Sequence, residues 1–279
     1  MTSTTTMTAA RDGTPILVRH WAPARAAWAT VVLVHGVAEH SGRYERVGDW
    51  LTAAGLDVVS YDQRGFGASG GRRAYVDRWA QVHDDLAERL VAARAAARER
   101  PIVLWGHSLG GLIALGYCVA DPARPLPDAL VLSAPALDAA IAPWKRSLAP
   151  VLAAVAPRLE IANGFEPGIL AADPAVDEAY LADPLVLTRT TTRFGLASFR
   201  EQARVRSLLG RLAVPTYVYH GEDDRLVPTA SSEPLGRLPT VTRRTWPGLR
   251  HETHNEANGR EVIGAAVEWL RSVLGSADN

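Results

Sequence analysis

Short apolar runs alternate with longer amphipathic or Ala-rich stretches along most of the chain. The apolar runs predict β-strands at Thr14–Trp21, Thr30–His35, Leu56–Tyr61, Ile102–Trp105, Ala129–Ser133, Thr216–His220 and Val241–Trp246. The stretches between them predict helices at Ser41–Ala54, Trp79–Arg100, Leu109–Ala120 and Glu261–Leu274. Strands that alternate with helices form a mostly parallel sheet covered on both faces. The pattern therefore predicts an α/β fold.

The segment between the strands at Ala129–Ser133 and Thr216–His220 is too long for one crossover helix. It contains several prolines and one run of apolar residues at three-to-four-residue spacing, which predicts an amphipathic helix. That stripe consists of Trp144, Leu148, Val151, Leu152, Val155 and Leu159. We predict a disordered tail over 1–10, a core over 11–140 and 208–279, and a cap or lid inserted over 141–207. The stripe is expected to pack the cap on the core at least in part, and it could also rest on a lipid surface, since the two roles are compatible.

Composition narrows the classes of function. The 279 residues carry 30 Lys+Arg and 30 Asp+Glu, and this zero net charge argues against a nucleic-acid partner. The single cysteine, Cys118, excludes an internal disulfide and a multi-cysteine zinc site. The Thr-rich start has no signal-peptide pattern, and no apolar run reaches the roughly 18–20 residues that span a bilayer. We expect a soluble, cytoplasmic protein.

The strongest chemical motif is Gly106-His107-Ser108-Leu109-Gly110, which follows a predicted strand and precedes a predicted helix. A nucleophile elbow needs this context, because small flanking residues permit a tight turn that exposes the serine hydroxyl. The helix behind it directs free N–H groups at a developing oxyanion. Ser108 is therefore the predicted nucleophile, and we expect His107 to be a packing residue.

A serine nucleophile needs a base that is oriented by a carboxylate. Three acids follow the strand Thr216–His220, at Glu222, Asp223 and Asp224. Asp224 is favoured because the spacing Gly221-x-x-Asp224-x-x-Val227 resembles the acid turn of serine hydrolases. Asp223 is the alternative, and Glu222 is expected to be solvated.

The base is expected in the loop after the last strand, where His251 and His254 compete. The spacing Gly248-x-x-His251 favours His251. A zinc site does not fit, because the two histidines are one residue too close for the H-E-x-x-H pattern. For the oxyanion hole we expect the backbone N–H of Leu109, next to the nucleophile, and that of Val37, after an early strand.

These motifs together resemble the monoacylglycerol lipase and lysophospholipase family. The segments that carry the resemblance are His35–Tyr44, Tyr61–Gly70, Gly106–Gly111, Leu132–Pro135 and the Asp224 and His251 turns. In the cap only Asp183-Pro184-Leu185 matches, and loosely. One departure is Leu109, where many members have Met. The resemblance implies an α/β-hydrolase fold, with a mostly parallel central sheet flanked by helices and a helical cap inserted after the sixth strand.

The resemblance also implies an alcohol-side pocket formed by Glu39, Arg43 and His254, with a helix-start salt bridge as the alternative for the first two. It implies hydrolysis of monoacylglycerols to a fatty acid and glycerol through an acyl-enzyme on Ser108, with no cofactor. Alternatives are a lysophospholipase, a short- or medium-chain carboxylesterase, and a catalytically silent lipid-binding homologue. The expected partner is a small lipid ester, with transient membrane contact through the cap. Oligomeric state, acyl-chain length and head-group preference stay open.

Overall fold

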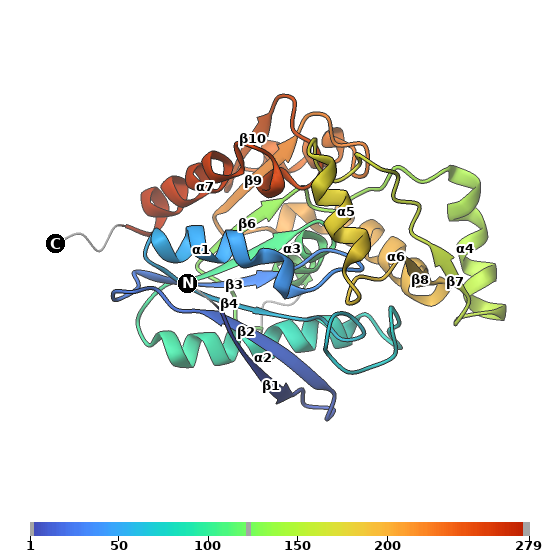
Figure 1. The fold of residues 1–279 in the computed structure, drawn as a ribbon, viewed down its shortest axis with the longest axis horizontal. Helices are drawn as coiled ribbons and strands as arrows, with labels where there is room; N and C mark the ends of the chain where they lie inside the picture. Colours follow the sequence, from blue (N-terminus) through green and yellow to red (C-terminus); the bar gives the residue numbers. More distant parts are fainter. Residues whose placement is uncertain (1–2, 121–123, 276–279) are drawn as a thin grey trace.

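An eight-stranded sheet runs through the centre of the molecule (Figure 1). In the computed structural model, which describes residues 3–120 and 124–275, the strand order is β1-β2-β4-β3-β5-β6-β9-β10. Their bounds are β1 Thr4–Ala9, β2 Pro15–Trp21, β3 Ala29–Val34, β4 Leu56–Tyr61, β5 Ile102–His107, β6 Ala129–Ser133, β9 Thr216–Gly221 and β10 Val241–Trp246. β2 is antiparallel to both neighbours, and the remaining described pairings within this sheet are parallel. The predicted mostly parallel sheet is confirmed.

Helices cover both faces of this sheet (Figure 1). One face carries α1 (Glu45–Ala53) and α7 (Gly259–Leu274), and the other carries α2 (Ala80–Ala97) and α3 (Leu109–Ala120). Every residue of β3, β5, β6 and β9 is buried, because these central strands have a helical layer on each side. Short 3₁₀ turns complete the core: η1 Ser41–Tyr44, η2 Leu209–Arg211, η3 Thr229–Ser232, η4 Leu235–Arg237 and η5 Thr253–Asn255.

The prediction of a disordered tail over residues 1–10 was wrong for Thr4–Ala9. These residues form the edge strand β1, whose partners on β2 run from His20 opposite Thr4 to Pro15 opposite Ala9. The threonines offer no alternating apolar pattern, but their β-branched side chains favour extended backbone, which explains the strand. The first two residues of that predicted tail lie outside the described residues.

The segment between β6 and β9 forms its own group of elements, at the right of Figure 1. It contains α4 (Pro143–Val155), β7 (Glu160–Ala162), α5 (Pro174–Ala182), β8 (Arg189–Thr191) and α6 (Thr192–Leu208). We refer to residues 141–207 as the cap segment. β7 and β8 pair as a small antiparallel sheet, which the sequence pattern did not predict. The helix α6 packs on α3 and on α4, and so joins the cap segment to the core.

The apolar stripe of α4 faces outward. The exposed fractions of Trp144, Leu148, Val151 and Val155 are 61%, 47%, 58% and 75%. On the same helix, Ala153 is buried. Most of the stripe is therefore open to solvent as a row of large apolar side chains, whereas its Leu152 is half-buried.

Candidate active site

The nucleophile candidate Ser108 lies in a one-residue turn between a strand and a helix. β5 ends at His107 and α3 begins at Leu109. The backbone of Ser108 is left-handed, with φ of 52°, a conformation that side chains other than glycine adopt only under constraint. A Cβ atom at Gly110 would lie 2.1 Å from the carbonyl oxygen of Val34, so the helix approaches the sheet more closely than any side chain allows. This is the tight, strained turn of a nucleophile elbow.

The carboxylate of Asp224 is surrounded by hydrogen-bond donors. Its Oδ2 lies 2.7 Å from Nδ1 of His251 and 3.0 Å from Nε2 of His220. Its Oδ1 accepts from the backbone N–H groups of Leu226 at 2.8 Å and Val227 at 2.9 Å. Burial alone would raise the pKa of Asp224, but the two histidines lower it well below its usual range. The group is therefore an anion that holds His251 in place.

The imidazole of His251 is oriented for proton transfer. Its Nδ1 is held by Asp224, which leaves Nε2 to accept a proton. Burial lowers the pKa of His251, but the Asp224 carboxylate outweighs burial and raises the pKa above its usual 6.5. His251 and Ser108 are 2% and 4% exposed and line the same cavity. The structure thus brings the predicted nucleophile, base and acid into one site.

The competing candidates lie elsewhere or lack partners. Glu222 and Asp223 are exposed, and Glu222 accepts a hydrogen bond from Thr245 at 2.7 Å. His254 is buried, and its ring stacks on Tyr44 with the centroids 5.2 Å apart. Its Nε2 has no hydrogen-bond partner among the described residues. The geometry therefore favours Asp224 and His251 over these alternatives.

Two backbone N–H groups border the nucleophile. Val37 lines the cavity, in a loop where a Cβ built on Gly36 would lie 3.4 Å from Cβ of Ser108. Leu109 is the first residue of α3, so its N–H has no acceptor within the helix. Neither amide takes part in a backbone hydrogen bond in the described part of the chain. Among the described residues, neither amide therefore has a backbone acceptor, as is required of the predicted oxyanion donors.

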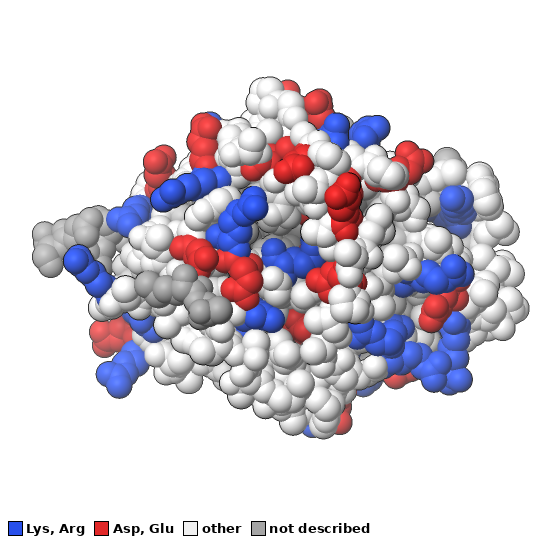
Figure 2. Space-filling view, in the orientation of Figure 1, with Lys and Arg blue, Asp and Glu red and all other residues white. Residues whose placement is uncertain are grey.

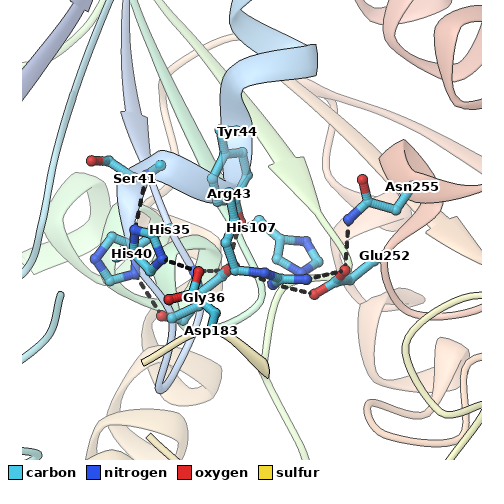
Figure 3. A network of polar contacts seen from close by, with 12 residues as sticks. His35, Gly36, His40, Ser41, Arg43, Tyr44, His107, Asp183, Glu252 and Asn255 are labelled. Atoms are coloured by element: carbon cyan, nitrogen blue, oxygen red, sulfur yellow. Dashed lines mark hydrogen bonds and ion pairs between the residues drawn. The ribbon is translucent and has the colours of Figure 1, made fainter. Parts of the chain in front are cut away.

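A buried ion network lies beside the nucleophile (Figure 3). The Arg43 guanidinium binds Glu39 Oε2 at 2.5 Å and both oxygens of Glu252, at 2.7 and 2.9 Å. Glu39 Oε1 also accepts from the Tyr44 hydroxyl at 2.7 Å and the Gly36 N–H at 2.5 Å. The side chains of Glu39 and Glu252 are each 3% exposed, and that of Arg43 is 10% exposed. The Glu39–Arg43 salt bridge, one of the two expectations for this pair, is present.

The predicted alcohol-side residues occupy different depths. Glu39 lines the catalytic cavity, as does Glu252. Arg43 lies beneath the Tyr180 ring, 4.7 Å from its centroid, and His254 lies between Tyr44 and His107. Of the three predicted residues, the structure places Glu39 on the cavity wall and the other two behind it.

Sequence analysis missed several residues of the site. His220 is the second histidine on the Asp224 carboxylate, and its place at the end of a predicted strand was the available signal. Four apolar or aromatic side chains close the cavity, and no pattern in the sequence marked them. They are Phe165, Leu170, Tyr180 and Leu226.

The cavity is small, with about 10 Å³ open to a water-sized molecule. This volume holds about one water, so a larger ligand needs side chains of the lining to move. No cluster of three or more His, Cys, Asp or Glu side chains suited to a metal ion occurs within residues 3–120 and 124–275.

Comparisons with known proteins match most of the length of this chain. Residues 25–258 match the serine aminopeptidase (S33) family. A monoacylglycerol lipase from Mycolicibacterium smegmatis is 33% identical over 94% of this chain and 95% of its own length. An uncharacterized abhydrolase domain-containing protein from Dictyostelium discoideum is 30% identical over the whole chain, which spans only 30% of that protein. The crystal structure of a Paleococcus ferrophilus monoacylglycerol lipase superposes with a TM-score of 0.83 at 29% identity, covering 92% of this chain and 99% of that one.

Proposed function

Since the chain belongs to the serine aminopeptidase (S33) family of α/β-hydrolases, we propose that it is a carboxylic-ester hydrolase that cleaves monoacylglycerols to a fatty acid and glycerol. The observation that carries this proposal is the elbow serine, Ser108, which lines one cavity with His251, the histidine held by Asp224. Apolar and aromatic side chains of the cap segment cover that cavity, which suits an acyl chain. The similarity to monoacylglycerol lipases over nearly the whole chain supports the choice of substrate.

The proposed reaction runs through an acyl-enzyme. His251 takes the hydroxyl proton of Ser108 as the serine oxygen attacks the ester carbonyl. The N–H groups of Val37 and Leu109 donate to the oxyanion of the tetrahedral intermediate. Collapse of the intermediate releases glycerol, which receives the proton from His251. Water then attacks the acyl-enzyme with His251 again as base. The bond between the acyl carbon and the Ser108 oxygen breaks, His251 returns the proton to Ser108, and the fatty acid leaves.

The cavity walls favour an ester over a peptide substrate. An aminopeptidase needs a carboxylate to bind the substrate's α-amine, and both glutamates on the wall, Glu39 and Glu252, are already bound by Arg43. Three acids of the cap segment, Glu160, Glu166 and Glu178, are exposed and do not line the cavity. The wall therefore offers no unpaired acid for an amine among the described residues.

A substrate panel and one variant test the proposal. We expect the wild-type protein to hydrolyse monoacylglycerols faster than diacylglycerols, triacylglycerols or lysophosphatidylcholine, and a fluorophosphonate probe to label Ser108. Ser108→Ala abolishes both turnover and labelling while its thermal unfolding stays close to that of the wild type. Undiminished ester turnover by this variant refutes the assignment of the nucleophile. If lysophosphatidylcholine is hydrolysed faster than monoacylglycerols, the proposed substrate is wrong and a lysophospholipid takes its place.

We further propose that the cap segment contacts membrane surfaces transiently to collect its substrate. The support is the exposed apolar face of α4, with Trp144 and Leu148. Lys and Arg side chains, with some Asp and Glu, lie at the right-hand end of the molecule in Figure 2, where Figure 1 places α4. No helix within the described ranges combines the length and apolar character needed to cross a bilayer, so contact would be peripheral. Replacing both side chains by Ser should reduce co-sedimentation with phosphatidylcholine–phosphatidylglycerol vesicles. Unchanged vesicle binding contradicts this proposal and leaves the ester hydrolysis untouched.

A further inference from the structure

A turn of the cap segment is bonded directly to the loop that carries Val37. This turn, Asp183–Leu187, follows α5. Its Leu187 N–H donates to the carbonyl oxygen of Ala38 at 2.8 Å. Two residues further along the loop, Nε2 of His40 lies 2.8 Å from Oδ2 of Asp183 (Figure 3). The cap segment thus holds this loop by one backbone bond and one side-chain bond.

The hydrogen-bond roles in the side-chain contact are fixed by the neighbouring groups. Nδ1 of His40 accepts from the N–H of Gly42 at 3.2 Å, so in the neutral ring the hydrogen is on Nε2 and is donated to Asp183. The other oxygen of Asp183 accepts from the N–H of Leu185 at 2.8 Å. Burial alone would raise the pKa of Asp183, but the His40 hydrogen bond lowers it below its usual value. Asp183 is therefore an anion with both oxygens engaged.

The loop needs such restraint because its backbone is strained. Ala38 has a φ of 66°, in the left-handed region that is unfavourable for a residue with a Cβ. Strain of this kind persists only where surrounding contacts fix it. On the core side the loop is fixed by Glu39, whose carboxylate accepts the N–H of Gly36. On the opposite side the contacts are those to Asp183 and Leu187.

We infer that Asp183 is a positioning residue for ester hydrolysis, which fixes the Val37 N–H toward the oxyanion by holding His40 against the cap turn. This rests on the proposed function, because it assigns Val37 a donor role in that reaction. A donor displaced by a fraction of an ångström stabilises the transition state less than one already in place. The position of the cap turn therefore sets the strength of the oxyanion site, and moving the cap loosens the site.

Four variants and a matched control separate positioning from general support. Asp183→Ala removes the acceptor and His40→Ala removes the donor, whereas His40→Gln keeps an N–H within reach of Asp183. Asp183→Asn retains one acceptor oxygen, and it replaces Asp183→Ala in the assays if that variant does not fold. The control is Arg193→Ala, which removes a different bond between cap segment and core, the guanidinium donating to the Asp77 carbonyl at 2.6 Å.

The readouts are kcat and KM for a soluble p-nitrophenyl ester, and affinity for a trifluoromethyl ketone, which binds serine hydrolases as a tetrahedral oxyanion. We expect Asp183→Ala and His40→Ala to lose about tenfold in kcat and in ketone affinity, less than removal of a whole donor costs. KM should change less than about twofold, since substrate binding precedes oxyanion formation. The double variant should lose no more than either single variant, because the two residues act as one unit. His40→Gln should retain most of the kcat and ketone affinity that His40→Ala loses.

The outcomes distinguish this inference from the proposed function. If Asp183→Ala retains wild-type kcat and ketone affinity in an enzyme that hydrolyses esters, the inference is wrong and the proposed function stands. A loss seen only in KM, or equal to the loss in Arg193→Ala, also overturns it, because general loosening of the cap would explain such a result. If the wild-type protein neither hydrolyses esters nor reacts with the fluorophosphonate, the proposed function itself has failed. Circular dichroism of every variant excludes unfolding as the cause.

Discussion

Replacing Arg43 with Met should destabilise the fold far more than removing an exposed arginine. Arg43 is the cation between two carboxylates, at 2.5 Å from Glu39 and 2.7 and 2.9 Å from Glu252. Both glutamate side chains are 3% exposed. Methionine fills similar space but leaves these carboxylates buried without their partner.

The magnitude follows from this burial. Breaking a buried ion pair by removing one partner costs about 3–5 kcal/mol, because the remaining charge is neither paired nor hydrated. For a chain of this size each kcal/mol lowers Tm by about 2–4 °C, so the expected decrease is roughly 6–20 °C. The matched control is Arg94→Met, whose pair with Asp128 is about equally close, at 2.7 Å, but has side chains 41% and 40% exposed. Such a surface pair contributes about 0–1 kcal/mol.

The loss of stability in Arg43→Met should also depend on pH, and the protonation of Glu252 determines the direction of this dependence. In the wild type burial would raise the pKa of Glu252, but Arg43 lowers it well below its ordinary 4.5. Its contribution to stability is therefore fully present above pH 4.5 and is lost only as the pH falls through the lower, folded-state pKa. Without Arg43, burial raises the pKa of Glu252 above 4.5. The folded variant then binds more protons than the unfolded chain, so its stability decreases as the pH rises through the raised pKa.

Urea unfolding at pH 8.0 and pH 5.0, followed by tryptophan fluorescence, measures both effects. We expect the difference in unfolding free energy between wild type and Arg43→Met to be larger at pH 8.0 than at pH 5.0. Arg94→Met should stay within about 1 kcal/mol of the wild type at both values. The reasoning is refuted if Arg43→Met loses less than about 1 kcal/mol at pH 8.0, or if its loss is the same at both pH values.

Three further predictions concern the reaction and the fold. Asp224→Asn should lower kcat by about 10⁴, because the amide NH₂ would face either the Nδ1–H of His251 or the backbone N–H groups of Leu226 and Val227, so His251 loses its orientation; a loss below tenfold in folded protein contradicts this. The kcat/KM of the wild type should fall as the pH drops through the raised pKa of His251, with the midpoint of the acid limb above 6.5; a midpoint below 6.5 contradicts the Asp224 contact. Gly110→Ala places a Cβ 2.1 Å from the Val34 carbonyl oxygen and should cost about 3 kcal/mol or more in urea unfolding. Its control, Gly264→Ala in α7, meets nothing within 4 Å and should gain about 0.5–1 kcal/mol, and equal effects of the two would count against the clash.

The central sheet and the turns at its carboxyl ends could be predicted because local residues dictate them. The elbow at Ser108 needs glycine at Gly106 and Gly110, where a Cβ would lie within 2.4 Å of backbone atoms. A short motif therefore records a backbone constraint, and its place between strand and helix is visible in the hydrophobic pattern. The same holds for Asp224, whose side chain binds backbone N–H groups two and three residues later.

Features that depend on contacts between distant segments could not be predicted in this way. Thr4–Ala9 form a strand only because β2 supplies the hydrogen-bonding edge, and the threonines carry no periodic signal of it. Tyr180 reaches the cavity from the cap segment, where the sequence offers helical spacing but no register against the core. Glu252 was adjacent to a predicted base, yet its partner, Arg43, is 209 residues away. Contacts between residues so far apart in the sequence depend on the tertiary fold and leave no local pattern in the sequence.

The carboxylate of Asp183 makes both kinds of contact, one within its own turn and one with a distant segment. Within its own turn, the side chain of Asp183 accepts the N–H of Leu185, a local arrangement that a short sequence can specify. The same carboxylate also reaches His40, 143 residues earlier, at the end of the strained loop that carries Val37. A motif that looks like ordinary turn chemistry thus acts across the boundary between cap segment and core. An Asx turn by itself accepts several residue types, whereas holding His40 requires an acceptor at this position, so the contact with His40 restricts residue 183 more than the turn alone does.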